Sequence, residues 1–258
     1  MKLFFFSLLS LASLHSQFLE PEWRGLDETN HAEWDVFTEA RTNPNFPDVA
    51  ADEDASITGT TSSAFITSGG NIYSFSAPTF FQLDDSTDFP VANVFLQISA
   101  LGSGVDLDTV RLIYSNAEGE TIQVFPGQVM TLSEEELGGE RGGIGSVYTM
   151  QWDLSDEPIS GTYTILFNAE ASSMSLGAVS LDTSASFMEV SFPQSLSLSV
   201  EGGLVNLSWL GDGQLQTCIS LNENDWVEVV EARGVNEISL PIESSSAFYR
   251  VQQVSSTE

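Results

Sequence analysis

Short alternations of apolar and polar residues dominate the chain from residue 60 to its end. Side chains at every second position share one face of a strand, so this period predicts β-strands rather than helices. Clusters of Gly, Asp, Asn, Ser and Pro separate the runs and favour turns. The fold class is therefore predicted to be all-β, with an aromatic-rich core between packed sheets. The predicted core residues are Tyr73, Phe75, Val94, Leu96, Ile98, Val110, Leu112, Tyr114, Ile122, Val124, Tyr148, Met150, Trp152, Leu154, Tyr163, Ile165 and Phe167.

One strand changes its apolar phase in the middle. In SSMSLGAVSLD, residues 172–182, Met174 and Leu176 have one parity, whereas Val179 and Leu181 have the other. One extra residue at Gly177-Ala178 would return all four side chains to the same face. This stretch is predicted to be a bulged core strand.

The first module, residues 56–185, is expected to be one sandwich. Its ending, YTILFNAEASSMSLGAVSLD, and its number of strands resemble the jelly-roll sandwiches of carbohydrate-binding and galactose-binding-like domains. The resemblance implies a jelly-roll-like β-sandwich and suggests a sugar ligand. Binding residues vary among those families, so none is assigned in this chain.

The second module, residues 188–254, contains about six short strand patterns. A strand ending in LSW, a later W-x-x-V and a closing FYRV resemble a fibronectin type III-like module of secreted bacterial proteins. The resemblance implies a small β-sandwich used for adhesion or as a spacer, and it transfers no catalytic residue.

The first 16 residues resemble a secretory signal peptide. Lys2 precedes the apolar run from Leu3 to Leu14, which is too short to span a bilayer and leads directly into polar sequence. Cleavage is expected after Ser16, with a site at Ala12 as the alternative. We therefore expect a secreted or cell-surface protein without a membrane span.

Residues 17–55 are expected to form an irregular N-terminal arm. WDVFTEA, residues 34–40, would make one or two helical turns, and the arm would anchor through Trp34, Phe37 and Phe46. A second helical turn is predicted at SEEEL, where Ser133 and Glu136 have the spacing of a capping box.

The charge of the chain is strongly negative. There are 37 acidic residues against 7 Lys and Arg, and Lys2 is the only lysine. Nucleic acids and anionic lipids require a basic face, so neither is an expected partner. Solubility in a salty medium, calcium binding and attraction of cationic partners would each explain the acidic surface.

Few residues could support catalysis. Only His31 remains after removal of the signal peptide, and Cys218 is the single cysteine, expected to be a small buried side chain. One histidine and one cysteine cannot supply a structural zinc site. The absence of disulfides in an exported chain favours a bacterial envelope or outer surface. No catalytic residue is assigned, and the protein is expected not to be an enzyme.

Acidic loops leave structural calcium open, although no cofactor and no metal ligand is assigned. Calcium takes six to eight oxygen ligands, but neither candidate stretch has the spacing of an EF-hand loop. Both are interpreted as solvated loops, and their carboxylates are Asp48, Asp52, Asp54, Asp84, Asp85 and Asp88.

Sugar binding would require exposed aromatic side chains with polar neighbours. Trp23 is the best exposed candidate, whereas Trp152, Trp209 and Trp226 fall in strand patterns and are expected in the cores. The identity of the binding residues stays unknown from the sequence.

Three functions remain in view. The first is a non-catalytic binding or cell-surface protein whose partner is a glycan or another envelope component. The second is a polysaccharide hydrolase with a pair of carboxylates, which would lie about 5–9 Å apart in a groove. The third is a structural envelope component without a small ligand.

Overall fold

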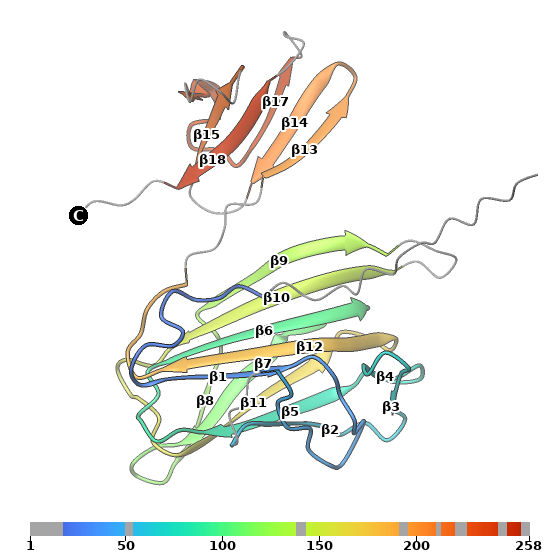
Figure 1. Cartoon of the computed structure of the whole chain (residues 1–258), viewed down its shortest axis with the longest axis vertical. Coiled ribbons are helices and arrows are strands. Elements are labelled where there is room, and N and C mark those ends of the chain that lie inside the picture. Colours follow the sequence, from blue (N-terminus) through green and yellow to red (C-terminus); the bar gives the residue numbers. More distant parts are fainter. Residues whose placement is uncertain are drawn as a thin grey trace, which may run out of the picture. The chain divides into compact units, whose positions relative to one another are not determined.

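The computed structural model describes residues 18–49, 54–137, 143–190, 196–209, 213–219, 226–241 and 247–253. The predicted signal peptide, residues 1–16, lies outside these ranges. The chain divides into two compact units, Met1–Ser191 and Phe192–Glu258, each built from antiparallel strands (Figure 1). Within the described ranges, the one helical element is a 3-10 turn, Val230–Ala232. The all-β prediction is confirmed.

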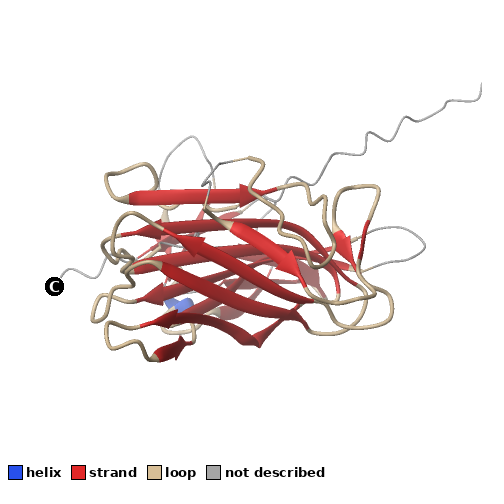
Figure 2. Cartoon of the chain, turned by 90° about the horizontal axis from the view of Figure 1, so that it is seen from below, coloured by secondary structure: helices blue, strands red, loops and turns tan. Residues whose placement is uncertain are grey.

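Two antiparallel sheets face each other in the first unit (Figure 2). The seven-stranded sheet contains β1 (Thr29–Trp34), β3 (Phe65–Ile66), β4 (Ile72–Tyr73), β6 (Asn93–Gly102), β9 (Gln128–Glu136), β10 (Ile144–Asp153) and β12 (Met174–Ser184). The five-stranded sheet contains β2 (Ser56–Gly59), β5 (Phe80–Ser86), β7 (Val105–Ser115), β8 (Thr121–Val124) and β11 (Thr162–Ala169).

Strand order shows that the chain crosses repeatedly between the layers. The seven-stranded sheet runs β3-β4-β12-β6-β10-β9, with β1 also paired to β12, and the five-stranded sheet runs β2-β5-β11-β7-β8. Thus β5, β6 and β7 alternate between sheets, and so do β10, β11 and β12. Both inner faces contribute to one hydrophobic core, as expected for a sandwich.

The alternation of apolar and polar residues along the strands correctly predicts most of the core. Central alternations such as Val94-Leu96-Ile98 and Tyr163-Ile165-Phe167 are buried as predicted. The bulge is also confirmed, because the register between β12 and β6 shifts between Leu176 and Ala178. Met174, Leu176, Val179 and Leu181 all join the core.

The N-terminal arm is more regular than expected. Strand β1 pairs antiparallel with β12, from Thr29 opposite Ser184 to Trp34 opposite Val179. The helical turns predicted in WDVFTEA are wrong, because residues 35–40 form no helix. Trp34 and Phe37 are buried, but Phe46 is 61% exposed, so its predicted anchoring role is wrong. Asn45 takes this role instead, since its buried side chain accepts hydrogen bonds from the backbone of Thr38 and Glu39, both at 2.9 Å.

The helical turn predicted at SEEEL is also wrong. Residues 133–136 belong to β9, an edge strand whose partner is β10. Pairing with β10 outweighs the local capping pattern, and charged side chains are common on edge strands because they oppose pairing between molecules. No helix in the described part of the chain is long and apolar enough to cross a membrane.

Gly102, at the end of β6, offers a test of close backbone packing. Its φ is +91°, and an added Cβ would lie 2.3 Å from the Ser173 carbonyl oxygen. We expect Gly102→Ala to lower the free energy of unfolding by about 2–4 kcal/mol, from backbone strain plus overpacking. Gly119 is the control, because its φ is +81° but no atom lies within 4 Å of an added Cβ. Gly119→Ala should therefore lower the free energy of unfolding by only about 1 kcal/mol. Equal losses in urea denaturation would contradict the close approach.

The second unit consists of two three-stranded sheets. One has the order β13 (Leu196–Glu201), β14 (Leu204–Trp209), β17 (Glu237–Pro241), and the other β16 (Val227–Glu228), β15 (Gly213–Cys218), β18 (Phe248–Gln253). A small core includes Leu207, Trp209 and Leu215. Cys218 is buried and has no disulfide partner, in agreement with its predicted packing role.

Candidate functional site

The tryptophan expected to form an exposed sugar platform is buried. Trp23 is 2% exposed. It lies in residues 18–28, which we call the N-terminal strap because they cross the outer face of the seven-stranded sheet. Trp152 and Trp209 are buried as predicted, and Trp226 is half-buried. A sugar platform therefore has to be sought among other aromatic residues.

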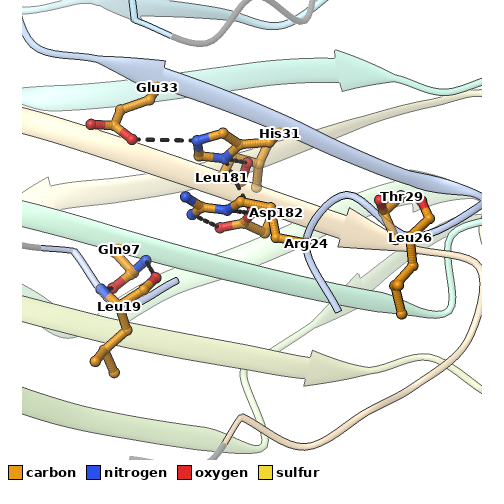
Figure 3. Close-up of polar contacts among 9 residues, drawn as sticks. All are labelled: Leu19, Arg24, Leu26, Thr29, His31, Glu33, Gln97, Leu181 and Asp182. Atoms are coloured by element: carbon orange, nitrogen blue, oxygen red, sulfur yellow. Dashed lines mark hydrogen bonds and ion pairs between the residues drawn. The ribbon is translucent and has the colours of Figure 1, made fainter. Parts of the chain in front are cut away.

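Amide side chains on the outer face of the sheet hold the adjoining segments. The Gln97 side chain accepts a hydrogen bond from the Leu19 amide at 2.8 Å and donates to the Leu19 carbonyl at 2.9 Å (Figure 3). The Gln151 side chain binds the segment after β12: it accepts a hydrogen bond from the Val190 amide at 3.0 Å and donates one to the Met188 carbonyl at 2.8 Å. These amides pair with backbone as a neighbouring strand would.

An ion-pair cluster fixes the strap further along. The Arg24 guanidinium donates two hydrogen bonds to the fully buried Asp182 carboxylate, at 2.6 and 2.8 Å (Figure 3). The two ring nitrogens of His31 lie 3.1 Å from Asp182 and 3.3 Å from Glu33. The histidine on which catalysis would have depended thus lies within a structural ion-pair network between β1, β12 and the strap.

The stretch LDDSTD, residues 83–88, is predicted from the sequence to be a solvated loop, but its first four residues belong to β5 and their carboxylates face opposite sides of the sheet. Asp85 points into the sandwich, is 3% exposed, and accepts a hydrogen bond from the Tyr163 hydroxyl. Asp84 points outward and accepts hydrogen bonds from the side chains of Gln82 and Thr164. Because neighbouring strand residues face opposite ways, these two carboxylates cannot share one ion.

The second acidic stretch is also engaged in local structure. Asp48 accepts hydrogen bonds from the backbone amides of Asp35 and Val36, at 2.8 and 2.9 Å. Asp54 and Asp88 are exposed, and Asp52 lies outside the described residues. Across the described ranges, no group of three or more His, Cys, Asp or Glu side chains is placed to hold a metal ion.

A pocket of about 330 Å³ lies between the strap and the segment that follows β12. Three carboxylates and several apolar side chains form its wall, and the lining residues are Leu19, Glu20, Pro21, Glu22, Trp23, Leu26, Met188, Glu189 and Val190. Its acidic lining makes it the place in the first unit where a carboxylate-dependent reaction would be sought.

Three aromatic rings gather at the β3–β4 hairpin of the seven-stranded sheet. The ring centroids of Phe65 and Phe75 lie 5.5 Å apart with an interplanar angle of 28°, and Tyr73 meets both rings edge-on. Phe65 is 40% exposed and Phe75 is 64% exposed. We refer to Phe65, Tyr73 and Phe75 as the aromatic cluster. Because large exposed apolar patches are a common feature of interaction sites, the cluster is a candidate binding surface.

The hairpin β3–β4 positions the cluster. Phe65 lies directly opposite Tyr73 in the strand pairing, so the two rings form a cross-strand pair. The connecting turn includes Gly70, whose φ of +83° suits glycine. Directly after β4, the hydroxyl of the buried Ser74 forms a hydrogen bond with the Ser63 hydroxyl at 2.9 Å. The Ser74 carbonyl accepts a hydrogen bond from the Ser173 amide at 2.8 Å. These bonds set the direction of Phe75.

The segment of sequence that carries the cluster contains no charged residue. Residues 55–83 contain no Asp, Glu, Lys or Arg, in a chain where 17% of residues are charged. Every exposed residue in this range is Ser, Thr, Gly or Phe: Thr60, Ser62, Ser63, Phe65, Ser68, Gly69, Phe75, Ser76 and Phe80. The exposed part of this segment therefore offers hydroxyl groups and aromatic rings.

The cluster contradicts one core prediction. In NIYSF, Tyr73 and Phe75 are expected to point inward, yet Ile72 and Ser74 are the buried residues. The strand is only two residues long, and Ile72 competes for the core with the opposite parity. This competing isoleucine, together with the absence of charge around it, is the signal by which the surface could have been found.

No family model matches the chain, and a search of curated proteins gave no match.

Proposed function

We propose that the protein is a secreted, non-catalytic binding protein that holds a glycan at the aromatic cluster. The observation that carries the proposal is the exposure of Phe75 and Phe65 on a well-anchored hairpin, surrounded by serine and threonine hydroxyls. Sugar rings present C–H faces that pack on aromatic rings, while their hydroxyls exchange hydrogen bonds with polar neighbours. The predicted signal peptide supports a location outside the cytoplasm.

The arrangement of strands supports both resemblances drawn from the sequence. Repeated crossing of consecutive strands between two antiparallel sheets is compatible with a jelly-roll-like first module. In the second unit, the first strand pairs with the second and the second with the fifth, while the third pairs with the fourth and the sixth. This exchange between sheets is compatible with a fibronectin type III-like spacer or adhesion module.

Affinity electrophoresis through gels containing polysaccharides tests the proposal. Phe75→Ala should weaken binding at least about tenfold, because truncation of a central aromatic contact costs about 2 kcal/mol or more. Phe125→Ala is the matched control, since Phe125 is 55% exposed and lies outside the cluster. Both variants should remain folded by circular dichroism. Equal retardation of the two variants would contradict a site at the cluster.

The hydrolase alternative has one observation in its favour, the three glutamates that line the pocket beside the strap. If the pocket is catalytic, the wild-type protein releases reducing sugars from a polysaccharide and Glu189→Gln abolishes the release. Release of no sugar, together with loss of gel retardation in Phe75→Ala, would favour the binding function. A protein that neither binds nor cleaves glycans would fit the structural envelope role.

A further inference from the structure

We infer that the ligand of the aromatic cluster is a single chain of an uncharged polysaccharide. This inference rests on the proposed function, and it adds the class of glycan that the cluster selects. Two observations carry it: the distribution of charge around the cluster and the relative orientation of its rings.

The charge distribution disfavours an anionic polymer. The chain has a formal net charge of −30, which repels polyanions at long range. Close to the rings, residues 55–83 supply hydroxyls and no ionic group. A hydroxyl is both a donor and an acceptor, so it complements sugar hydroxyls, whereas a carboxylate or sulfate would lose its water without gaining a counter-charge.

Arg41 is the cationic side chain that reaches this segment. Its guanidinium donates a hydrogen bond to the Ser62 carbonyl, and the residue is exposed. An anionic glycan would need such a cation, because an unpaired carboxylate or sulfate is strongly repelled here. Arg41 therefore separates the two classes of ligand: it contributes little to binding of a neutral chain and would dominate binding of an anionic one.

The ring geometry argues for one chain rather than a crystalline surface. A flat polysaccharide crystal is matched by aromatic rings that lie in one plane. Here the rings of Phe65 and Phe75 are stacked on each other at 28°, and Tyr73 stands at 78° and 85° to them. The most exposed ring is that of Phe75, so the cluster presents a compact contact for one sugar chain.

The test uses the full chain in native gels that contain a neutral polysaccharide, xyloglucan or galactomannan, or an anionic one, alginate or polygalacturonate. We expect retardation in at least one neutral gel. That retardation should fall at least about tenfold in Phe75→Ala and persist in Arg41→Gln and Phe125→Ala. It should also survive roughly 0.5 M sodium chloride, because no ion pair is involved.

Other outcomes overturn different parts of the proposal. Retardation in an anionic gel that disappears in Arg41→Gln and in high salt would overturn the uncharged class while leaving glycan binding intact. Phe75-dependent binding to crystalline cellulose or chitin, without retardation in soluble gels, would overturn the single-chain geometry. Failure of every gel and solid to bind the wild-type protein would overturn the proposed function itself.

Discussion

Replacement of Arg24 by alanine is expected to lower the free energy of unfolding by about 3–5 kcal/mol. The substitution removes both hydrogen bonds that the guanidinium donates to Asp182, and it leaves this fully buried carboxylate without the charge that compensates it. An uncompensated buried charge is costly, because the protein interior does not replace its lost hydration. Urea denaturation followed by circular dichroism measures the loss.

Two further variants isolate the buried charge as the cause. Arg24→Ala combined with Asp182→Asn should be more stable than Arg24→Ala alone, since the amide carries no charge to compensate. Arg41→Ala removes an exposed arginine of the same unit and should change stability by less than about 1 kcal/mol. Similar losses for the two single arginine variants would show that Arg24 does not compensate the buried Asp182 carboxylate.

Phe37→Ala is expected to cost about 3–5 kcal/mol, whereas Phe46→Ala should change stability by about 0.5 kcal/mol or less. The chemical change is identical in both variants. Phe37 is 1% exposed and belongs to the main core, so its removal leaves a cavity, while Phe46 is 61% exposed.

The same denaturation experiment compares the two phenylalanines directly. The pair tests whether the N-terminal region folds as part of the sandwich, because only a docked region makes Phe37 matter. If both variants lost the same small amount, residues 35–49 would not be packed on the core as described.

Alternation of apolar residues was sufficient to predict the long central strands. β6 and β10 each span ten residues, so one face accumulates several large side chains and the phase is unambiguous. The bulge in β12 was also predictable, because an internal change of phase has few explanations other than an extra residue.

Short and edge elements were not predictable in the same way. At SEEEL the local sequence satisfies a capping box, and only the partner strand β10 makes it extended. In NIYSF, Tyr73 and Phe75 outnumber Ile72, so the alternation favours the wrong face of a strand that is only two residues long. In both cases contacts that are distant in sequence decide the structure, and a local pattern contains no record of them.

The candidate site was misplaced for a related reason. Trp23 stands among polar residues in an N-terminal segment, which predicts exposure. Its burial depends on Gln97 and Asp182, which lie more than 70 residues away and bind the strap from the sheet. A polar residue at an outward strand position normally faces water. Nothing in the sequence shows that Gln97 and Asp182 bind the strap instead.

The bulge in β12 has a consequence for how this fold can vary. Gly177 separates two lengths of one strand that have different neighbours: Ser175 and Leu176 pair with β4, whereas Val179 to Ser184 pair with β1. The hairpin that carries the aromatic cluster thus joins the sheet through a ladder of two residues. The turn of the hairpin is also tied to the residues after β1, because the Phe37 amide donates a hydrogen bond to the Gly70 carbonyl at 2.7 Å. Under the proposed function, substitutions at the exposed rings of Phe65 and Phe75 would change the ligand contact while the pairing of β12 with β6 stays intact.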